Sequence, residues 1–257
     1  MKRSPNIGLR IAPGLTILLL LALWEIGVRA WSVPAWILPA PSRVIQVTLG
    51  SLSLLLSNTM ITLGEAVLGF ALSVLLALLL AFAFNLLPGL RQAFYPLMIV
   101  SQTIPLITLA VLFTIWFGWG LLPKVLVVVL VCFFPIAINL IRGIDGVDPE
   151  MINLFRSMGA GKLKIWNMVQ FPLAMPSFFA GLRISATYSI MAAVIGEWMG
   201  AQAGLGYYMT LQQKNFAVDQ VLAAVLVICL ASLLLVKAVD AAEYLLVPWQ
   251  RHHNIYY

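Results

Sequence analysis

Charged residues are scarce in this chain of 257 residues. Only 9% of the residues are charged and 62% are hydrophobic, whereas soluble globular domains are about 25% charged and about 45–50% apolar. A soluble enzyme of this size would lack the charges that cover a water-exposed surface, and a disordered chain would be poor in apolar residues. Both classes are therefore excluded, and the composition indicates a protein that lies in a lipid bilayer.

The long runs without charge have the length of membrane-spanning helices. A helix needs about 20 apolar residues, rising about 1.5 Å each, to cross about 30 Å of hydrocarbon. Membrane β-barrels show short alternating segments instead, and no such alternation occurs here. The sequence therefore predicts an all-α polytopic membrane protein with six transmembrane helices, at about 11–28, 59–84, 93–117, 121–141, 176–197 and 218–239.

Catalytic and metal-binding motifs are missing as well. Gly161-Lys162 lacks the first glycine and the Ser or Thr of a phosphate-binding loop. The two histidines, His252 and His253, lie in the C-terminal tail, far from any acidic cluster. We therefore expect no catalytic residue, no metal site and no cofactor of the chain's own.

Lys and Arg are unevenly distributed between the predicted loops. If the N-terminus is cytoplasmic, eleven of the 15 basic residues lie on the cytoplasmic side, as the positive-inside rule requires. This predicts a multi-pass protein of the cytoplasmic membrane with both termini, residues 1–10 and 246–257, in the cytoplasm. Because the basic residues are dispersed, with no run longer than Lys2-Arg3, no nucleic-acid binding is expected.

The first predicted span is open to two interpretations. Its basic start, apolar stretch and small-residue site at residues 28–30 resemble a secretory signal peptide. Arg29 beside that site, with Trp24, Trp31 and Trp36, favours an uncleaved anchor whose aromatic residues lie at the membrane interface. In the second interpretation, residues 11–54 form a first transmembrane helix and an outer loop.

Residues 142–175 form the longest predicted cytoplasmic loop and carry seven charges. Asp148 and Pro149 are typical of a helix start, and Gly159 of a helix end. Between them, apolar residues recur with helical spacing at Met151, Leu154, Phe155 and Met158. A second amphipathic stretch, 162–171, is expected to end at Pro172.

The apolar stripe of this loop has two possible roles. It can pack against the bilayer surface or the protein's own core, or it can fit the groove of a soluble partner. The residues alone do not choose between these roles.

The loop resembles the coupling loop of ABC importer permeases. Asn153-Leu-Phe-x3-Gly159-x9-Val169-Gln-Phe-Pro172 follows the spacing of the EAA-x3-G-x9-I-x-L-P motif of that family, although its first three residues depart from Glu-Ala-Ala. Segments 38–42, 116–120 and 197–207 are similar to permeases of the nitrate/sulfonate/taurine branch, which includes importers of thiamine pyrimidine precursors.

The resemblance implies a type I ABC importer transmembrane domain over 55–245, with the coupling loop at 142–175. It also implies a homodimer in a bacterial inner membrane, two cytoplasmic ABC ATPase subunits that bind the ATP, and an extracytoplasmic solute-binding protein. The residues implied in ATPase coupling are Met151, Asn153, Leu154, Phe155, Arg156, Met158, Gly159, Ala160 and Pro172.

Three polar residues in or near the spans are candidates for the transport pathway: Glu65, Gln102 and Glu197. An ionisable residue in a span is a functional candidate, although near a span end it can also snorkel to the interface. An acidic group at Glu65 suits a neutral or cationic heterocycle, such as a thiamine pyrimidine precursor, better than a sulfonate or nitrate. We expect Arg183 and Glu197, about 21 Å apart along one helix, to be separate interface anchors.

A secondary transporter or channel that uses no ATPase is the alternative function. It requires ionisable residues deep in the spans, and the middle of the predicted spans is almost free of them. Two prolines, Pro105 and Pro135, are expected to kink the third and fourth spans. The glycines at 196, 200 and 204 indicate either close helix contact or turns.

Overall fold

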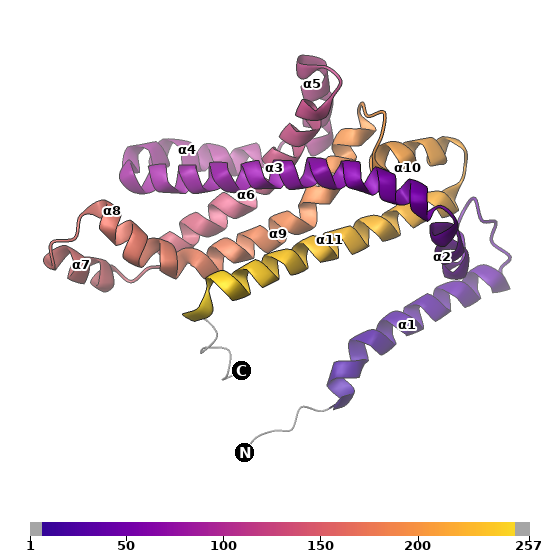
Figure 1. Cartoon of the computed structure of the whole chain (residues 1–257), viewed down its shortest axis with the longest axis horizontal. Coiled ribbons are helices and arrows are strands. Elements are labelled where there is room, and N and C mark those ends of the chain that lie inside the picture. The colour runs from indigo at the N-terminus through magenta and orange to yellow at the C-terminus, as the bar shows by residue number, and fades with distance from the viewer. Residues whose placement is uncertain (1–6, 250–257) are drawn as a thin grey trace. The chain divides into compact units, whose positions relative to one another are not determined.

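The computed structural model describes residues 7–249, without the side chains of residues 7–11 and 13. In this part of the chain every element of regular structure is helical (Figure 1), which confirms the all-α prediction. The elements are α1 (Ile7–Ala30), α2 (Pro41–Gly50), α3 (Leu52–Leu86), α4 (Pro88–Ser101), α5 (Leu106–Phe117), α6 (Leu121–Asp145), α7 (Pro149–Ser157), α8 (Lys162–Ile165), the π-helical turn η1 (Trp166–Gln170), α9 (Phe171–Trp198), α10 (Leu205–Lys214) and α11 (Val218–Leu246).

Four helices of the described chain are long and apolar enough to cross a membrane: α3, α6, the continuous helix Lys162–Trp198 and α11. The pair α4 and α5 makes a fifth if it is one broken span. The predicted count of six spans is therefore not confirmed. The first predicted span lies within α1, where the side chains of residues 7–11 and 13 are outside the description.

The third predicted span is broken rather than kinked. Between α4 and α5 the chain bends by 103°, and Pro105 stands directly before the first residue of α5. Proline has no N–H to continue a helix and its ring clashes with the preceding turn. Pro135 has a milder effect, since α6 continues through it to Asp145.

Contacts divide the chain into two compact units. Unit 1 comprises the described part of Met1–Ser57 together with Tyr208–Val227, and unit 2 comprises Asn58–Tyr207 with the described part of Ile228–Tyr257. The domain limits predicted at residues 54 and 245 stay predictions. The predicted tails 1–10 and 246–257, and with them His252 and His253, fall largely outside the described residues.

Small residues allow α6 and α9 to pack closely in unit 2. A methyl group at Gly181 would lie 2.8 Å from the carbonyl oxygen of Pro135, so the two backbones come together at this glycine. Beside it, the hydroxyl of Ser185 donates to the carbonyl of Cys132 at 2.8 Å. Close approach and interhelical hydrogen bonds of this kind hold helices together in a bilayer, where burial alone gives little driving force.

Arg183 binds two acidic residues of α11. Its guanidinium donates to Asp240 at 2.8 Å and also to Glu243. The expectation that Arg183 is an interface anchor stays a prediction, and the structure adds that its charge is paired within the chain. Asp240 and Glu243 are one helical turn apart on α11, so one arginine can reach both carboxylates.

Unit 1 has its own polar contacts. The carboxylate of Glu25 accepts from Arg29 and from the backbone N–H of Ser42 at 3.0 Å. Arg43 donates to Asp219 at 2.9 Å. These pairs connect α1 to the start of α2, and α2 to the start of α11.

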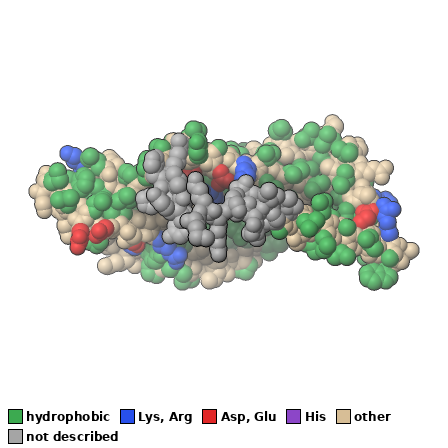
Figure 2. All heavy atoms as spheres, turned by 90° about the horizontal axis from the view of Figure 1, so that it is seen from below, with side chains coloured by type: hydrophobic (Ala, Val, Ile, Leu, Met, Phe, Trp, Pro, Cys, Tyr) green, Lys and Arg blue, Asp and Glu red, His purple; other side chains and the backbone are tan. Residues whose placement is uncertain are grey.

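Large hydrophobic side chains are exposed along much of the described chain. On α1 alone, Leu15, Leu18 and Ile26 are each about 60% exposed. Figure 2 shows hydrophobic side chains over much of one face, with acidic and basic ones in a few small groups. Such a surface matches lipid or partner helices rather than water.

Candidate functional site

Helix α7 begins and ends as the sequence predicts. The side chain of Asp148 accepts the N–H of Glu150 at 2.9 Å, and Pro149 is the first helical residue. After the helix, Gly159 has a φ of +78°, a backbone conformation that residues with a Cβ rarely adopt. This short helix therefore has defined ends in the sequence itself.

Most of the apolar stripe of α7 is exposed. Met151, Leu154 and Met158 are 42%, 59% and 75% exposed, and no residue of the helix is buried. Three of the four stripe residues therefore do not pack into the protein's own core, whereas Phe155 is partly covered. Of the other residues implied in coupling, Asn153, Arg156 and Gly159 are exposed and Phe155 and Ala160 half-buried.

Pro172 lies apart from α7, and the prediction that it ends a helix is wrong. It is the second residue of α9, directly after the π-helical turn η1, and the helix continues through it to Trp198. In that turn the N–H of Phe171 bonds the carbonyl of Trp166, five residues back. The extra residue widens the helix just before the proline, which accommodates a residue without an N–H.

The pathway candidate Gln102 lies at the break between α4 and α5. Its side chain is exposed and lines a small cavity of about 260 Å³ together with Ser101, Phe134 and Tyr188. This cavity does not include Glu65 or Glu197. The three pathway candidates therefore do not form one site.

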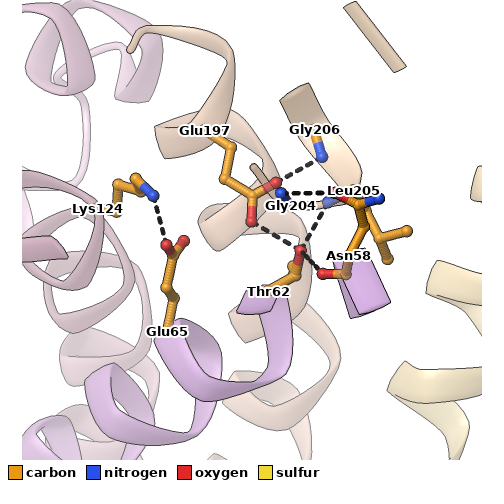
Figure 3. A network of polar contacts seen from close by, with 8 residues as sticks. All are labelled: Asn58, Thr62, Glu65, Lys124, Glu197, Gly204, Leu205 and Gly206. Atoms are coloured by element: carbon orange, nitrogen blue, oxygen red, sulfur yellow. Dashed lines mark hydrogen bonds and ion pairs between the residues drawn. The ribbon is translucent and has the colours of Figure 1, made fainter. Parts of the chain in front are cut away.

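Glu65 and Glu197 do belong to one polar cluster, at the end of the α6–α9 pair opposite α7 (Figures 1 and 3). Glu197, on the last turn of α9, is 1% exposed. Its carboxylate accepts from the hydroxyl of Thr62 at 2.7 Å and from the N–H of Gly206 at 2.5 Å. The expectation that Glu197 is an interface anchor is therefore wrong.

Side chains of α3 complete the contacts around the start of α10. The hydroxyl of Thr62 accepts the N–H of Leu205 at 2.8 Å, and the side chain of Asn58 accepts the N–H of Gly204 at 2.9 Å (Figure 3). The first N–H groups of a helix have no partner within the helix, and the partial positive charge there favours a carboxylate. Glu197, Thr62 and Asn58 thus satisfy successive donors at this helix start.

The glycines of this segment have two different roles. Gly196 lies against α6, since a methyl group there would be 3.1 Å from Cα of Lys124. Gly204 has a φ of +110°, and a Cβ on it would overlap the carboxylate of Glu197. Both interpretations of the glycine repeat are therefore realised, close helix contact at Gly196 and a turn at Gly204.

Glu65 forms an ion pair with Lys124. Oε1 of Glu65 lies 2.5 Å from Nζ of Lys124, and the two side chains are 3% and 12% exposed. The other oxygen of Glu65, Oε2, is buried without a hydrogen-bond partner. Since an unpaired buried acceptor is costly, this oxygen is an unusual feature of the site.

A cavity of about 310 Å³ opens beside this ion pair. We call it the Glu65 pocket, and its walls include Glu65, Lys124, Trp119, Gly200 and Gln202. Sequence reasoning identified Glu65 and Glu197 but missed Lys124, Thr62 and Asn58. A signal for Lys124 existed, because Glu65 and Lys124 are each the single charged residue in a long apolar stretch.

Among the described residues no group of three or more His, Cys, Asp or Glu is arranged to hold a metal ion. What the cluster offers is hydrogen-bond acceptors and one ion pair in an apolar surrounding, where such contacts are strong.

Comparison with known proteins shows which family this fold belongs to. Residues 69–252 match the model of the binding-protein-dependent transport system inner membrane component. The formylaminopyrimidine transport permease protein ThiX of Halalkalibacterium halodurans is 36% identical, over 98% of this chain and 99% of its own. The riboflavin transport system permease protein RibX of Chloroflexus aurantiacus is 35% identical, over 96% and 91%.

More distant proteins agree with this assignment. The taurine transport system permease protein TauC of Escherichia coli is 27% identical, over 91% of this chain and 88% of its own. A crystal structure of an amino acid ABC transporter with histidines has the same fold, with a TM-score of 0.63 at 17% identity, over 78% and 98% of the chains.

These relatives are transport components of membranes, which agrees with the apolar helices and with the expected absence of an enzymatic role. They are permeases of ABC importers, so the alternative of a secondary transporter or channel is not supported. The chain is a multi-pass membrane protein that belongs to the family of binding-protein-dependent transport system inner membrane components, and it is an ABC importer permease.

Proposed function

We propose that two copies of this chain form the translocation pathway of an importer that is driven by two cytoplasmic ABC ATPase subunits. An extracytoplasmic binding protein delivers the solute. The observation that carries this proposal is the exposed apolar stripe of α7, a helix with defined ends and no buried residue. An amphipathic helix of this kind fits a hydrophobic groove of a partner, and the excess of Lys and Arg supports a cytoplasmic position for it.

In this mechanism the ATPase subunits bind and hydrolyse the ATP, and the permease responds to their movement. Closure of the ATPase dimer moves the two α7 helices toward each other. The continuous helix that begins at Lys162, just after α7, carries the movement across the membrane toward Glu197. The pathway then changes from inward-facing to outward-facing and accepts solute from the binding protein.

The homodimer is supported by an exposed stripe on α9. Ile184, Tyr188 and Met191 follow one another at helical spacing and are 43%, 44% and 46% exposed, on a helix whose other side is buried. A stripe with apolar and polar groups suits either a second copy of the chain or a solute pathway between two copies.

A nitrogen heterocycle of the pyrimidine-precursor type is the solute class that we propose. ThiX and RibX, at 36% and 35% identity, are named for formylaminopyrimidine and riboflavin transport, whereas TauC is 27% identical. An oxidised-sulfur anion is the second candidate, favoured by the similarity to TauC. Uptake of labelled formylaminopyrimidine and taurine by the reconstituted importer separates the two, because only the true solute is accumulated.

A substitution in α7 tests the coupling role. Leu154→Asp places a charge in the exposed stripe, and Ser157→Ala is a matched control away from it. The assay uses proteoliposomes that contain the ATPase, with the binding protein added. We expect Leu154→Asp to abolish uptake, and we expect its rate of ATP hydrolysis no longer to depend on the binding protein. The melting temperature should change little, because the side chain of Leu154 is 59% exposed. Coupled uptake by Leu154→Asp at the wild-type rate would contradict the proposal.

A further inference from the structure

We propose that Asn85 and Arg91, on either side of the turn between α3 and α4, are positioning residues that transmit the movement of α7 to α4. This inference rests on the importer function proposed above and adds a second route beside the continuous helix Lys162–Trp198. The turn lies at the same end of the α6–α9 pair as α7 (Figure 1). The observation that carries the inference is that each end of the loop containing α7 is bonded to one side of this turn.

The first bridge joins the start of α4 to the end of α6. The guanidinium of Arg91 donates to both carboxylate oxygens of Asp145, at 2.7 and 2.5 Å. Asp145 is the last residue of α6, and the cap residue of α7, Asp148, follows shortly after it. Between them Val147 is only 5% exposed, so this short connection is packed. A two-pronged contact fixes the orientation of both groups, and a shift at the start of α7 is therefore passed to the first turn of α4.

The second bridge joins the end of α3 to the segment that follows α7. The side-chain amide of Asn85 donates to Oε1 of Gln170, in the π-helical turn η1, at 2.7 Å. About one turn earlier on α3, the ring of Phe82 packs edge to face against Trp166 of η1, with the ring centroids 5.4 Å apart. Both ends of the loop are thus held by the same helix–turn–helix unit.

A cavity separates part of α7 from direct packing against this unit. All four bridge residues line one cavity of about 330 Å³, together with Pro149 and Ile152 of α7. The cavity gives α7 room to shift, so the bridges decide whether the turn follows. The side chains of Arg91 and Asp145 are 38% and 43% exposed, and exposed ion pairs stabilise a fold only slightly. The first bridge can therefore be removed with little effect on stability.

Helix α4 leads from this turn to the break in the third predicted span. It ends at Ser101, and the chain bends by 103° before α5 begins. The pathway candidate Gln102 lies in this break and lines the cavity of about 260 Å³. Because a short break between helices absorbs a change of direction, a tilt of α4 changes the shape of that cavity.

Coupled uptake in proteoliposomes with the ATPase and the binding protein tests this inference. The quantity measured is the uptake of labelled formylaminopyrimidine, or of labelled taurine if the wild type accumulates that solute instead, per ATP hydrolysed. We expect Arg91→Gln and Asp145→Asn each to lower this ratio about threefold or more. The variant with both substitutions should fall no further, because both break the same bridge.

Two further measurements separate transmission from folding and docking. The melting temperatures of these variants should stay close to that of the wild type, since the ion pair is partly exposed, and the ATPase subunit should still copurify. Lys237→Gln is the matched control. It removes a basic partner of Asp240 on α11 and should leave the ratio of uptake to hydrolysis unchanged.

A second variant keeps the test decisive if Arg91→Gln does not yield a monodisperse complex. Asn85→Ala breaks the other bridge without changing any charge, and it should lower the ratio as well. Wild-type ratios in these variants would overturn the inference. So would a double variant whose loss equals the product of the two single losses, because Arg91 and Asp145 would then act separately. Loss of the ATPase from the complex would also overturn it, because the turn would then belong to the docking surface.

Failure of this inference is distinguishable from failure of the proposed function. Leu154→Asp and Ser157→Ala are measured in the same proteoliposomes. If Leu154→Asp uncouples uptake while the bridge variants keep the wild-type ratio, the importer function stands and the turn does not transmit the movement. If Leu154→Asp leaves uptake coupled, the docking role of α7 fails, whatever the bridge variants do.

Discussion

Glu197 accepts a hydrogen bond from the N–H of Gly206 at 2.5 Å. This bond connects the end of the continuous helix Lys162–Trp198 to the first turn of α10. The contact is sterically tight as well, because a methyl group at Gly206 would lie 2.9 Å from Cβ of Glu197. The loop between α9 and α10 is thus held by a buried carboxylate, and its geometry depends on glycine at the positions that face it.

Gly204→Ala should destabilise the protein. The residue has a φ of +110°, and its new Cβ would overlap the carboxylate of Glu197. Strained backbone costs about 1–3 kcal/mol, and the overlap adds to that. Melting of the detergent-purified protein measures the effect. Gly64→Ala is the control, since no atom lies within 4 Å of a Cβ there, and it should melt at or slightly above the wild-type temperature. A Gly204→Ala protein as stable as Gly64→Ala would contradict the steric argument.

Thr62→Val and Glu197→Gln should show coupled effects on stability. Thr62 donates to Glu197 and accepts from Leu205, so the valine leaves two buried polar groups without partners. Each such group costs about 1–3 kcal/mol. In a double-mutant cycle we expect an interaction free energy of about 0.5–3 kcal/mol. Additive effects of the two substitutions would show that the contact contributes nothing of its own.

Arg183→Gln should loosen the contact between α9 and α11. The substitution leaves Asp240 and Glu243 close to each other without the cation that both bind. Because Arg183 is 38% exposed, we expect a loss of only about 1 kcal/mol. Adding Asp240→Asn to Arg183→Gln should restore part of the melting temperature, since it removes the like-charge repulsion. If the double variant melts below Arg183→Gln, repulsion is not the cause.

Features that depend on a few neighbouring residues are predictable from the sequence. The ends of α7 follow from Asp148, Pro149 and Gly159, and its stripe follows from helical spacing. At Pro105 the sequence predicts only a kink where the structure has a break, because the size of a bend depends on what the two halves pack against. At Pro172 it predicts a helix end, because a π-helical turn that accommodates a proline leaves no pattern in hydrophobic spacing.

Contacts between distant segments are not predictable in the same way. Glu65 and Lys124 are 59 residues apart, and Thr62 and Glu197 are 135 residues apart. The isolated charges of Glu65, Lys124 and Glu197 indicate that these residues need partners, but many pairings would satisfy that need. The interface anchor predicted at Glu197 is wrong because its donors are the backbone N–H of Gly206 and the hydroxyl of Thr62, which no charge pattern reveals.

The continuous helix Lys162–Trp198 is long enough that a small tilt would move its ends far. Its 37 residues correspond to about 55 Å of helix. A tilt of about 5° around its midpoint would therefore displace each end by about 2.4 Å. Hydrogen bonds tolerate only a few tenths of an ångström around their usual length. A tilt that begins beside α7 would then have one of two results at Glu197. Either α3 and α10 would move together with Glu197, or the hydrogen bonds from Thr62 and Gly206 to Glu197 would break. Even a small rotation of the helix would in the second case change which residues are in contact at its end.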